Sequence, residues 1–415
     1  MSFFSDILTS LFERTPLLRG VLTDDDKPIE ALCQDLLSSR GEVSGMSLAQ
    51  LVLDRYAGFD DDQKLALLTL IANEMDVSCG DAVAALQNYE SAPTAANYAA
   101  LTKLVEPARL QLIRRLNQTQ DATSQLVAMR HDLLRLLDKQ PDLAKLDIDF
   151  KNLFTTWFNR GFLVLRPINW GSPAHILEKI ISYESVHAIQ SWDDLRRRLQ
   201  PDDRRCFAFF HPAMPDEPLI FVEVALTSGT PNSIQTILSE THRSLAAADA
   251  DTATFYSISN CQAGLAGISF GNSMIKTVVQ HLLRDLPQIK TFVTLSPIPG
   301  FVKWIRETGQ FGETLNLKTL LPLVAHYLIA VKHLSGQPRD PVARFHLNNG
   351  AFVEAVHADA DVSENGLAQS CGVMVNYRYD LNKISANHEA YANQQSVVAS
   401  KAVKALAEQV QPVVA

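Results

Sequence analysis

A glycine-rich stretch in the middle of the chain has the spacing of a loop that could hold phosphate groups. Residues 255–259 form a β-branched and aromatic run that favours a strand. Apolar residues recur at helical spacing from Met274 to Leu286, and Pro287 ends the predicted helix. A helix N-terminus offers free N–H groups and a favourable dipole to an anion. Without side chains, glycines let a ligand approach the backbone closely. The spacing alone leaves two interpretations open, a phosphate-binding loop and an ordinary strand–helix turn. The glycines between the strand and the helix are Gly264, Gly267 and Gly271.

Longer strings around these glycines resemble known families. Gln262 and the spaced glycines resemble the pyrophosphate-binding loop of the acetyltransferase (GNAT) superfamily, which holds coenzyme A. The strings YSIS-x2-QxGLxG, GN-x2-IKxVV and LSPIPGFxKW, in this order, resemble malonyl-CoA decarboxylase of the bacterial type. Residues 341–351 and 370–379 carry the same resemblance. Specific strings carry the resemblance in roughly residues 155–385. The rest of the chain resembles the family only in its predicted architecture.

The resemblance implies decarboxylation of malonyl-CoA to acetyl-CoA and CO2, with no cofactor beyond the coenzyme A moiety of the substrate. The thioester carbonyl itself accepts the electron pair as CO2 leaves. The enzyme must therefore orient the carboxylate, stabilise the oxyanion and deliver a proton to the enolate. The residues that the resemblance assigns to coenzyme A binding are Gln262, Gly264, Gly267, Ser269, Gly271 and Asn272.

The resemblance also identifies Ser296 and His346 as a catalytic pair. Ser296 ends a predicted strand, 291–296, just after the glycine loop and its helix, and its hydroxyl can donate to the reacting acyl group. His346 can hold the carboxylate or relay the proton, because the pKa of a histidine lies near working pH. Tyr379 matches a family tyrosine near the site and could orient His346. By residue type alone, a serine before proline is also typical of a turn, and a lone histidine or tyrosine of packing.

Three further positions bear on this site. Animal members of the resembled family carry an acidic residue that supports the histidine, whereas the aligned position here is Ser269. This departure leaves the charge state and the partner of the histidine open. Asn348 and Asn376 could supply additional hydrogen-bond donors. The sequence does not determine whether the serine or the histidine protonates the enolate.

Other chemistries have weaker support. His211, Asp216 and Glu223 lack the spacing of convergent zinc ligands, so we predict no metal site. Cys261 lies near the glycine loop, but no paired histidine spacing supports a cysteine nucleophile. Two other functions remain possible on the same loop: an acyl-CoA-dependent acyltransferase and a non-catalytic acyl-CoA-binding regulator.

The pattern of the whole chain predicts two domains. Residues 1–158 show helical periodicity only, which indicates an all-helical bundle. Residues 159–415 alternate strands and helices, as expected for a GNAT-like mixed-sheet catalytic domain, with predicted strands at 162–165, 205–211, 219–226, 253–259 and 291–296. A run of three arginines, 196–198, is predicted to lie on a solvated helix face, with a phosphate contact as the alternative. Residues 396–410 are predicted to form a terminal helix.

Composition restricts the partners of the protein. A net charge of −9 argues against nucleic acid and anionic membrane surfaces as partners. Five scattered cysteines without a C-x-x-C pair suit a reducing compartment, and the chain has no recognisable presequence, so we expect a cytoplasmic protein. The partner that we expect is malonyl-CoA. The resemblance further implies a homo-oligomer, a dimer or tetramer, assembled through the helical domain.

Overall fold

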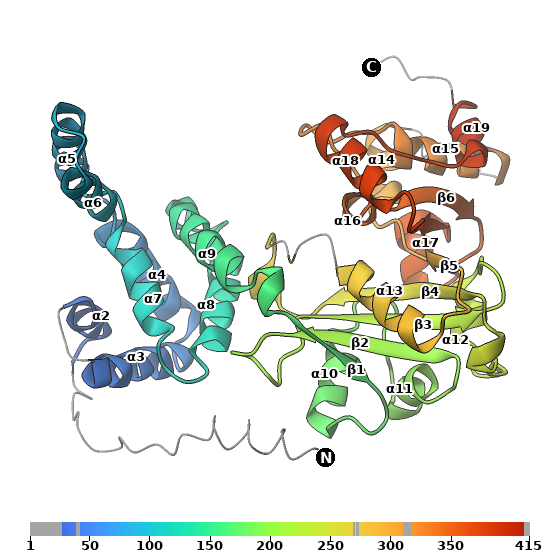
Figure 1. Cartoon of the computed structure of the whole chain (residues 1–415), viewed down its shortest axis with the longest axis horizontal. Coiled ribbons are helices and arrows are strands. Elements are labelled where there is room, and N and C mark those ends of the chain that lie inside the picture. Colours follow the sequence, from blue (N-terminus) through green and yellow to red (C-terminus); the bar gives the residue numbers. More distant parts are fainter. Residues whose placement is uncertain (1–26, 39–41, 269, 271–273, 310–316, 411–415) are drawn as a thin grey trace. The chain divides into compact units, whose positions relative to one another are not determined.

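The computed structural model describes residues 27–38, 42–268, 270, 274–309 and 317–410. These residues divide into two compact units (Figure 1). The helical unit contains the described residues up to Trp157 together with Ala263–Ile268. The sheet unit contains Phe158–Gln262 and the described residues from 270 onward. None of the helices in these ranges is long and apolar enough to cross a lipid bilayer.

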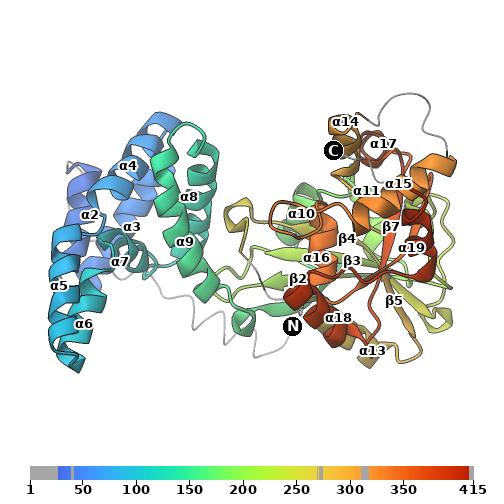
Figure 2. The same cartoon turned by 90° about the horizontal axis from the view of Figure 1, so that it is seen from above.

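Amphipathic helices make up the helical unit, and α8 and α9 lie side by side in it (Figure 2). Its core includes Leu126 and Leu133, which are fully buried. Asp60 starts α4 through a capping box with Gln63, as the acidic run 60–62 predicts. The helices and their bounds are α2 (Ile29–Leu37), α3 (Glu42–Ala57), α4 (Asp61–Glu74), α5 (Cys79–Ser91), α6 (Ala95–Leu104), α7 (Ala108–Leu116), α8 (Ala122–Leu136), η1 (Pro141–Leu143), α9 (Ala144–Trp157) and η4 (Ala263–Leu265).

The sheet unit is built on a seven-stranded mixed sheet with the order β1-β2-β3-β4-β5-β7-β6. Neighbouring strands are antiparallel except β4 and β5, which are parallel because α13 crosses over between them. Apolar residues fill the central strands, and β2 and β3 are buried almost throughout. The strands are β1 (Val164–Ile168), β2 (Arg204–Phe210), β3 (Ile220–Thr227), β4 (Thr252–Asn260), β5 (Thr291–Thr294), β6 (Phe352–His357) and β7 (Met374–Arg378).

The two parallel strands diverge partway along their length. Their ladder runs from Thr252–Thr291 to Phe255–Thr294, whereas β4 continues to Asn260. The register between β3 and β4 also shifts next to Glu223, which bends β4 locally. The second half of β4 therefore pairs with β3 on one side but lies outside the β5 ladder on the other. Such an edge can pair with an extended ligand.

Helices cover both faces of this sheet. Cys206, Ala208 and Phe210 of β2 face a core formed with α10 and α11, whereas Phe207, which points the other way, contacts His281 of α13. The helices of this unit are η2 (Arg160–Phe162), α10 (Ala174–Tyr183), α11 (Trp192–Leu199), α12 (Ile234–Leu238), η3 (Ala247–Asp249), α13 (Met274–Asp285), α14 (Phe301–Glu307), α15 (Leu317–Ile329), α16 (Pro341–Asn348), α17 (Glu364–Ser370), α18 (Ile384–Gln394) and α19 (Lys401–Ala407).

The predicted architecture is confirmed: an all-helical N-terminal region precedes a mixed-sheet domain. Some local expectations were wrong. The terminal helix begins only at Lys401, because residues 398–400 bond to Val353 of β6 as an extended segment. The strand expected at 162–165 starts at Val164. Strands β6 and β7 were not assigned from their periodicity, although both lie within or next to the strings that carry the resemblance.

The prediction of a solvated arginine run was wrong for Arg198. Its side chain is buried and donates to Glu223 on β3 at 3.3 Å and to Asp194 at 3.2 Å. Arg198 lies three residues after Leu195, so both face the sheet on α11. Burial raises the pKa of Glu223 to about 8 although the arginine opposes this shift. The sequence pattern showed the charge of this residue but not its buried partner.

Candidate active site

Ser296 lies just beyond the end of β5 and is fixed by the neighbouring strand β7. Its backbone N–H donates to the carbonyl oxygen of Val375 at 2.9 Å, and the N–H of Val375 donates back to Ser296 at 3.0 Å. Pro297 follows and has no N–H with which to continue a ladder. The chain therefore leaves the sheet at this point with the serine side chain held in place.

His346 is placed by a helix with clear start signals. Pro341 occupies the first position of α16, and the side chain of Asp340 caps it by accepting from the N–H of Ala343 at 2.9 Å. Asp340 is fully buried, and this burial raises the pKa of its carboxyl to about 6. The helix carries His346 into the interior, where its side chain is only 3% exposed.

The structure brings Ser296, His346 and Tyr379 together. The serine Oγ lies 3.1 Å from Nε2 of His346, and Nδ1 of the same ring lies 2.7 Å from the hydroxyl of Tyr379. The serine Oγ also contacts Oγ1 of Thr294 at 2.8 Å. All four side chains are buried, so these polar groups depend on one another for hydrogen bonds.

Burial determines the charge states in this group. It lowers the pKa of His346 to about 3, so the imidazole is neutral at physiological pH. The ring of Tyr377 stacks on the imidazole with centroids 4.6 Å apart and an interplanar angle of 24°, which excludes water from that face. Burial also raises the pKa of Tyr379 well above its usual value, so its phenol keeps its proton.

A neutral imidazole has one donor and one acceptor nitrogen, and this restricts the direction of the hydrogen bonds. If the hydroxyl of Tyr379 donates to Nδ1, then Nε2 carries the proton and donates to the serine Oγ. The serine hydroxyl is then free to donate onward, to Thr294 in this structure. In this arrangement the serine oxygen accepts a hydrogen bond from the imidazole. Accepting this bond makes the serine O–H a stronger donor to a developing negative charge.

Three neighbours of the site were not identified from the sequence. Thr294 precedes Ser296 by two residues and Tyr377 precedes Tyr379 by two residues, so the period of a strand could have indicated a shared face. Asp340 directly before a proline is a helix-start signal, which could have placed His346 on the second turn of a helix.

The predicted coenzyme A loop is described only in part. Gln262 donates its side-chain amide to the carbonyl oxygen of Pro218 at 3.1 Å and so contacts the turn between β2 and β3. Gly264 packs on α8: a Cβ atom there would lie 1.9 Å from the carbonyl oxygen of Val127. Gly267 has a φ of +75°, which favours glycine. Ser269, Gly271 and Asn272 lie outside the described residues, so their predicted roles stay predictions.

The remaining candidates have structural partners. Asn376 is buried and donates to the carbonyl oxygen of Thr294 at 2.7 Å, which ties β7 to β5. Asn348 is exposed, and its backbone carbonyl oxygen contacts Nδ1 of His388 at 2.7 Å. Burial raises the pKa of the Cys261 thiol and disfavours the nucleophilic thiolate. Among the described residues, no three His, Cys, Asp or Glu side chains are arranged to hold a metal ion.

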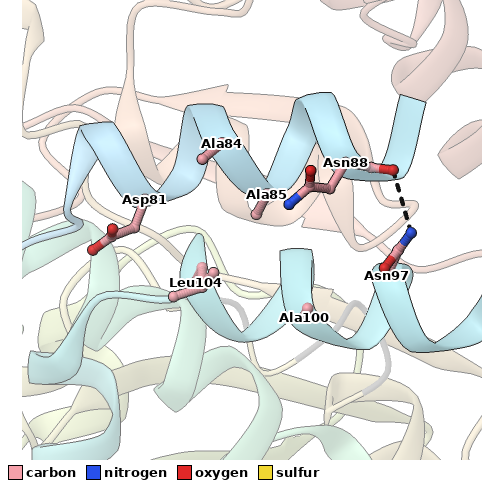
Figure 3. Close-up of a pocket in the computed structure, with 7 residues that line it drawn as sticks. All are labelled: Asp81, Ala84, Ala85, Asn88, Asn97, Ala100 and Leu104. Carbon is pink, nitrogen blue, oxygen red and sulfur yellow. Dashed lines mark hydrogen bonds between the residues drawn. The ribbon is translucent and has the colours of Figure 1, made fainter. Parts of the chain in front are cut away.

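A pocket in the helical unit lies between α5 and α6 (Figure 3). Small side chains, Ala84, Ala85 and Ala100, form much of its lining, and Asn97 donates across it to the carbonyl oxygen of Asn88 at 3.3 Å. No histidine, serine or cysteine lines it. It therefore contains neither of the residue types, serine and histidine, that the resemblance assigns to the catalytic pair.

Family models match both parts of the chain. The malonyl-CoA decarboxylase N-terminal domain matches residues 79–158, and the malonyl-CoA decarboxylase C-terminal domain matches residues 161–319 and 312–414. The crystal structure of malonyl-CoA decarboxylase from Rhodopseudomonas palustris is 46% identical, with a TM-score of 0.86 over 91% of this chain and 98% of that one. The corresponding structure from Agrobacterium vitis is also 46% identical, with a TM-score of 0.86 over 91% of this chain and 99% of that one.

Curated relatives give the same result. The mitochondrial malonyl-CoA decarboxylase of the goose Anser anser anser is 38% identical, and the match covers 74% of this chain and 70% of the goose protein. The mouse (Mus musculus) enzyme of the same name is 32% identical and covers 92% of this chain and 87% of its own. With family models, relatives and solved structures in agreement, this chain belongs to the malonyl-CoA decarboxylase family.

Proposed function

We propose that this protein decarboxylates malonyl-CoA to acetyl-CoA and CO2 through an enolate held by Ser296 and His346. The observation that carries the mechanism is the 3.1 Å contact between these side chains, which are 50 residues apart in the sequence. The family assignment supports the reaction, and the buried contact supports the residues. Serine and imidazole together supply a hydrogen-bond donor and a proton carrier, which are the two groups that a cofactor-free decarboxylation needs.

The electron pair follows a short path in this mechanism. The bond between the malonyl carboxylate carbon and the α-carbon breaks, CO2 leaves, and the electron pair moves into the thioester to form an enolate. Ser296 rotates its hydroxyl from Thr294 to the thioester oxygen, where negative charge develops. A buried donor stabilises this charge more strongly than water does, because the local dielectric constant is low.

His346 supplies the proton that the reaction consumes. In the free protein burial keeps the imidazole neutral, with a pKa of about 3. A malonyl carboxylate beside the ring raises this pKa, because an opposite charge favours the protonated form. The imidazole then takes up a proton when substrate binds and delivers it to the α-carbon after CO2 has left. Tyr379 keeps its own proton and holds the ring by its hydrogen bond to Nδ1.

One described feature of the sheet unit supports binding of the long thioester. The second half of β4 lies outside the β5 ladder, and an extended pantetheine arm with its amide groups can pair with such an edge. Ser296 follows directly after β5 on the other side of this divergence. We infer that the arm lies along β4 and brings the acyl group to Ser296.

Incubation of the purified protein with malonyl-CoA, EDTA and no added cofactor is expected to release CO2 and form acetyl-CoA. The thioester itself accepts the electron pair, so neither a metal ion nor an organic cofactor takes part in the proposed chemistry. Mass spectrometry of the coenzyme A products measures the result. Adding an amine or alcohol acceptor should leave product formation unchanged. Acyl transfer to that acceptor would favour an acyltransferase, and binding without turnover would favour a regulator.

We also infer a cytoplasmic homo-oligomer assembled through the helical unit. Large apolar side chains are exposed on and next to α5 and α6, including Val83, Leu86, Tyr98 and Val105, each with about half of its surface accessible. Exposed apolar groups of this kind are typical of contact surfaces. Light scattering on the purified protein should give the mass of a dimer or tetramer. A monomer at micromolar concentration would contradict this inference.

A further inference from the structure

Arg130 of α8 is completely buried and uses its guanidinium to hold the segment 263–268. Its Nη1 donates to the carbonyl oxygen of Gly264 at 2.6 Å, and its Nη2 donates to the carbonyl oxygen of Ala266 at 2.9 Å. Its Nε donates to Asp147 of α9 at 2.8 Å. All these residues belong to the helical unit, although the segment lies between β4 and α13 in the sequence.

These contacts set the direction of the peptide groups in the segment. In a planar trans peptide, the carbonyl oxygen and the following N–H point in opposite directions. Because the carbonyl of Ala266 points at Arg130, the N–H of Gly267 points away from Arg130. A loop that binds an anion must present N–H groups and turn its carbonyl oxygens away, since these oxygens repel phosphate. The guanidinium of Arg130 donates to the carbonyl oxygens of Gly264 and Ala266 on one side of the segment, and the N–H of Gly267 points to the opposite side.

Two further contacts fix the segment to the same helices. Gly264 lies so close to α8 that a Cβ atom would overlap the carbonyl oxygen of Val127 at 1.9 Å. Lys151 of α9 pairs with Asp147 at 2.8 Å, and its Cε lies 3.6 Å from the position of a Cβ atom on Gly267. The lysine side chain is 45% exposed and its ammonium pairs with the same carboxylate as Arg130, so two cations share one carboxylate beside this segment. This surrounding favours a negatively charged ligand.

We propose that Arg130 is a positioning residue for the nucleotide half of the substrate. It holds the carbonyls of Gly264 and Ala266 toward α8 so that the amide of Gly267 faces the phosphates of coenzyme A. The inference rests on the proposed function, because it assumes that the substrate is a coenzyme A thioester. Arg130 itself touches no reacting atom. Its loss therefore weakens binding of the nucleotide and leaves the chemistry at Ser296 intact.

The test uses Arg130→Lys, with Arg135→Lys as the matched control on the same helix. Lysine keeps a positive charge for Asp147, but its single nitrogen lacks the planar fork with which the three guanidinium nitrogens reach Asp147 and both carbonyl oxygens. Arg135 also forms ion pairs, with Asp61 and Asp132, but on the surface. For Arg130→Lys we expect KM for malonyl-CoA to rise at least about tenfold with kcat within about twofold. Turnover of malonyl-pantetheine, which lacks the nucleotide, should equal that of wild type.

Calorimetric titration with coenzyme A and with pantetheine separates this inference from the proposed function. Arg130→Lys should weaken coenzyme A binding and leave pantetheine binding unchanged, whether or not the wild-type protein releases CO2. Equal effects on both ligands, or no effect on either, would overturn the role of Arg130. Absence of CO2 release from wild type would overturn the proposed function alone.

If Arg130→Lys does not yield folded protein, hydrogen exchange on the wild-type chain decides the question. Coenzyme A should slow exchange of the Gly267 amide, and pantetheine should not. The backbone amides of the exposed hairpin α5–α6 serve as an internal reference that neither ligand should change. Unaltered exchange at Gly267 in the presence of saturating coenzyme A would show that Arg130 orients the segment for packing only.

Discussion

Replacing His346 by glutamine should lower kcat for malonyl-CoA by about 10²- to 10⁴-fold, the usual contribution of a positioned acid. Ser296→Ala should lower kcat by about 10²- to 10³-fold, the usual loss on removal of one oxyanion donor. Both groups act after the substrate is bound, so KM should change much less than kcat. Steady-state release of CO2 measures both parameters.

The contact between the two side chains predicts how the losses combine. Ser296 and His346 lie 3.1 Å apart and share one hydrogen bond, so removing either impairs the other. The kcat of the double variant should therefore be only slightly lower than that of the less active single variant. Tyr379→Phe removes only the hydroxyl that orients the ring, and a smaller loss of about tenfold is expected from one hydrogen bond.

His187→Gln is the matched control for the histidine substitution. His187 is also buried in the sheet unit, and its backbone contacts the carboxylate of Glu184 and the guanidinium of Arg198 instead of Ser296. This variant should retain wild-type kcat. Wild-type turnover by both His346→Gln and Ser296→Ala would refute the proposed pair.

The stability of the folded protein is expected to fall between pH 6.5 and pH 3, in part because of His346. Burial lowers the pKa of this histidine from 6.5 to about 3 in the folded state. Below pH 6.5 the unfolded chain binds a proton at this residue and the folded chain does not. The unfolded state therefore gains stability as the pH falls, and this one group costs about 2 kcal/mol of unfolding free energy at pH 5.

Equilibrium denaturation at pH 7 and pH 5 measures this effect. The difference in unfolding free energy between the two pH values should be about 2 kcal/mol smaller in His346→Gln than in wild type, because glutamine does not titrate. His187, whose pKa burial lowers to about 4, contributes a loss of the same sign. The His187→Gln variant therefore serves as a reference for how much one buried histidine changes the pH dependence of the unfolding free energy. An unchanged pH dependence in His346→Gln would mean that the imidazole has the same pKa in the folded and unfolded protein, and would contradict the neutral buried histidine.

Local patterns in the sequence correctly predicted much of the sheet unit. Alternating β-branched and aromatic residues gave β2, β3 and β4, and helical spacing gave α13 and its end before Pro287. These elements follow from interactions between neighbours in the chain, which periodicity records. The strings around the glycines gave the family. Together with residues 341–351 and 370–379, they also indicated Ser296, His346 and Tyr379 as candidates, which residue types alone would have left as ordinary turn and packing residues.

Only the tertiary structure could show what surrounds these residues. The neutrality of His346 depends on burial beneath Tyr377, and the orientation of the 263–268 segment depends on Arg130, 134 residues before Gly264 in the sequence. The burial of Arg198 depends on Glu223 in another strand. Desolvation and long-range hydrogen bonds arise from groups that the fold brings together. The sequence by itself determined many of the elements and the family. Packing decided which ionisable groups are neutral, which carbonyl groups point toward Arg130, and which side chains contact one another.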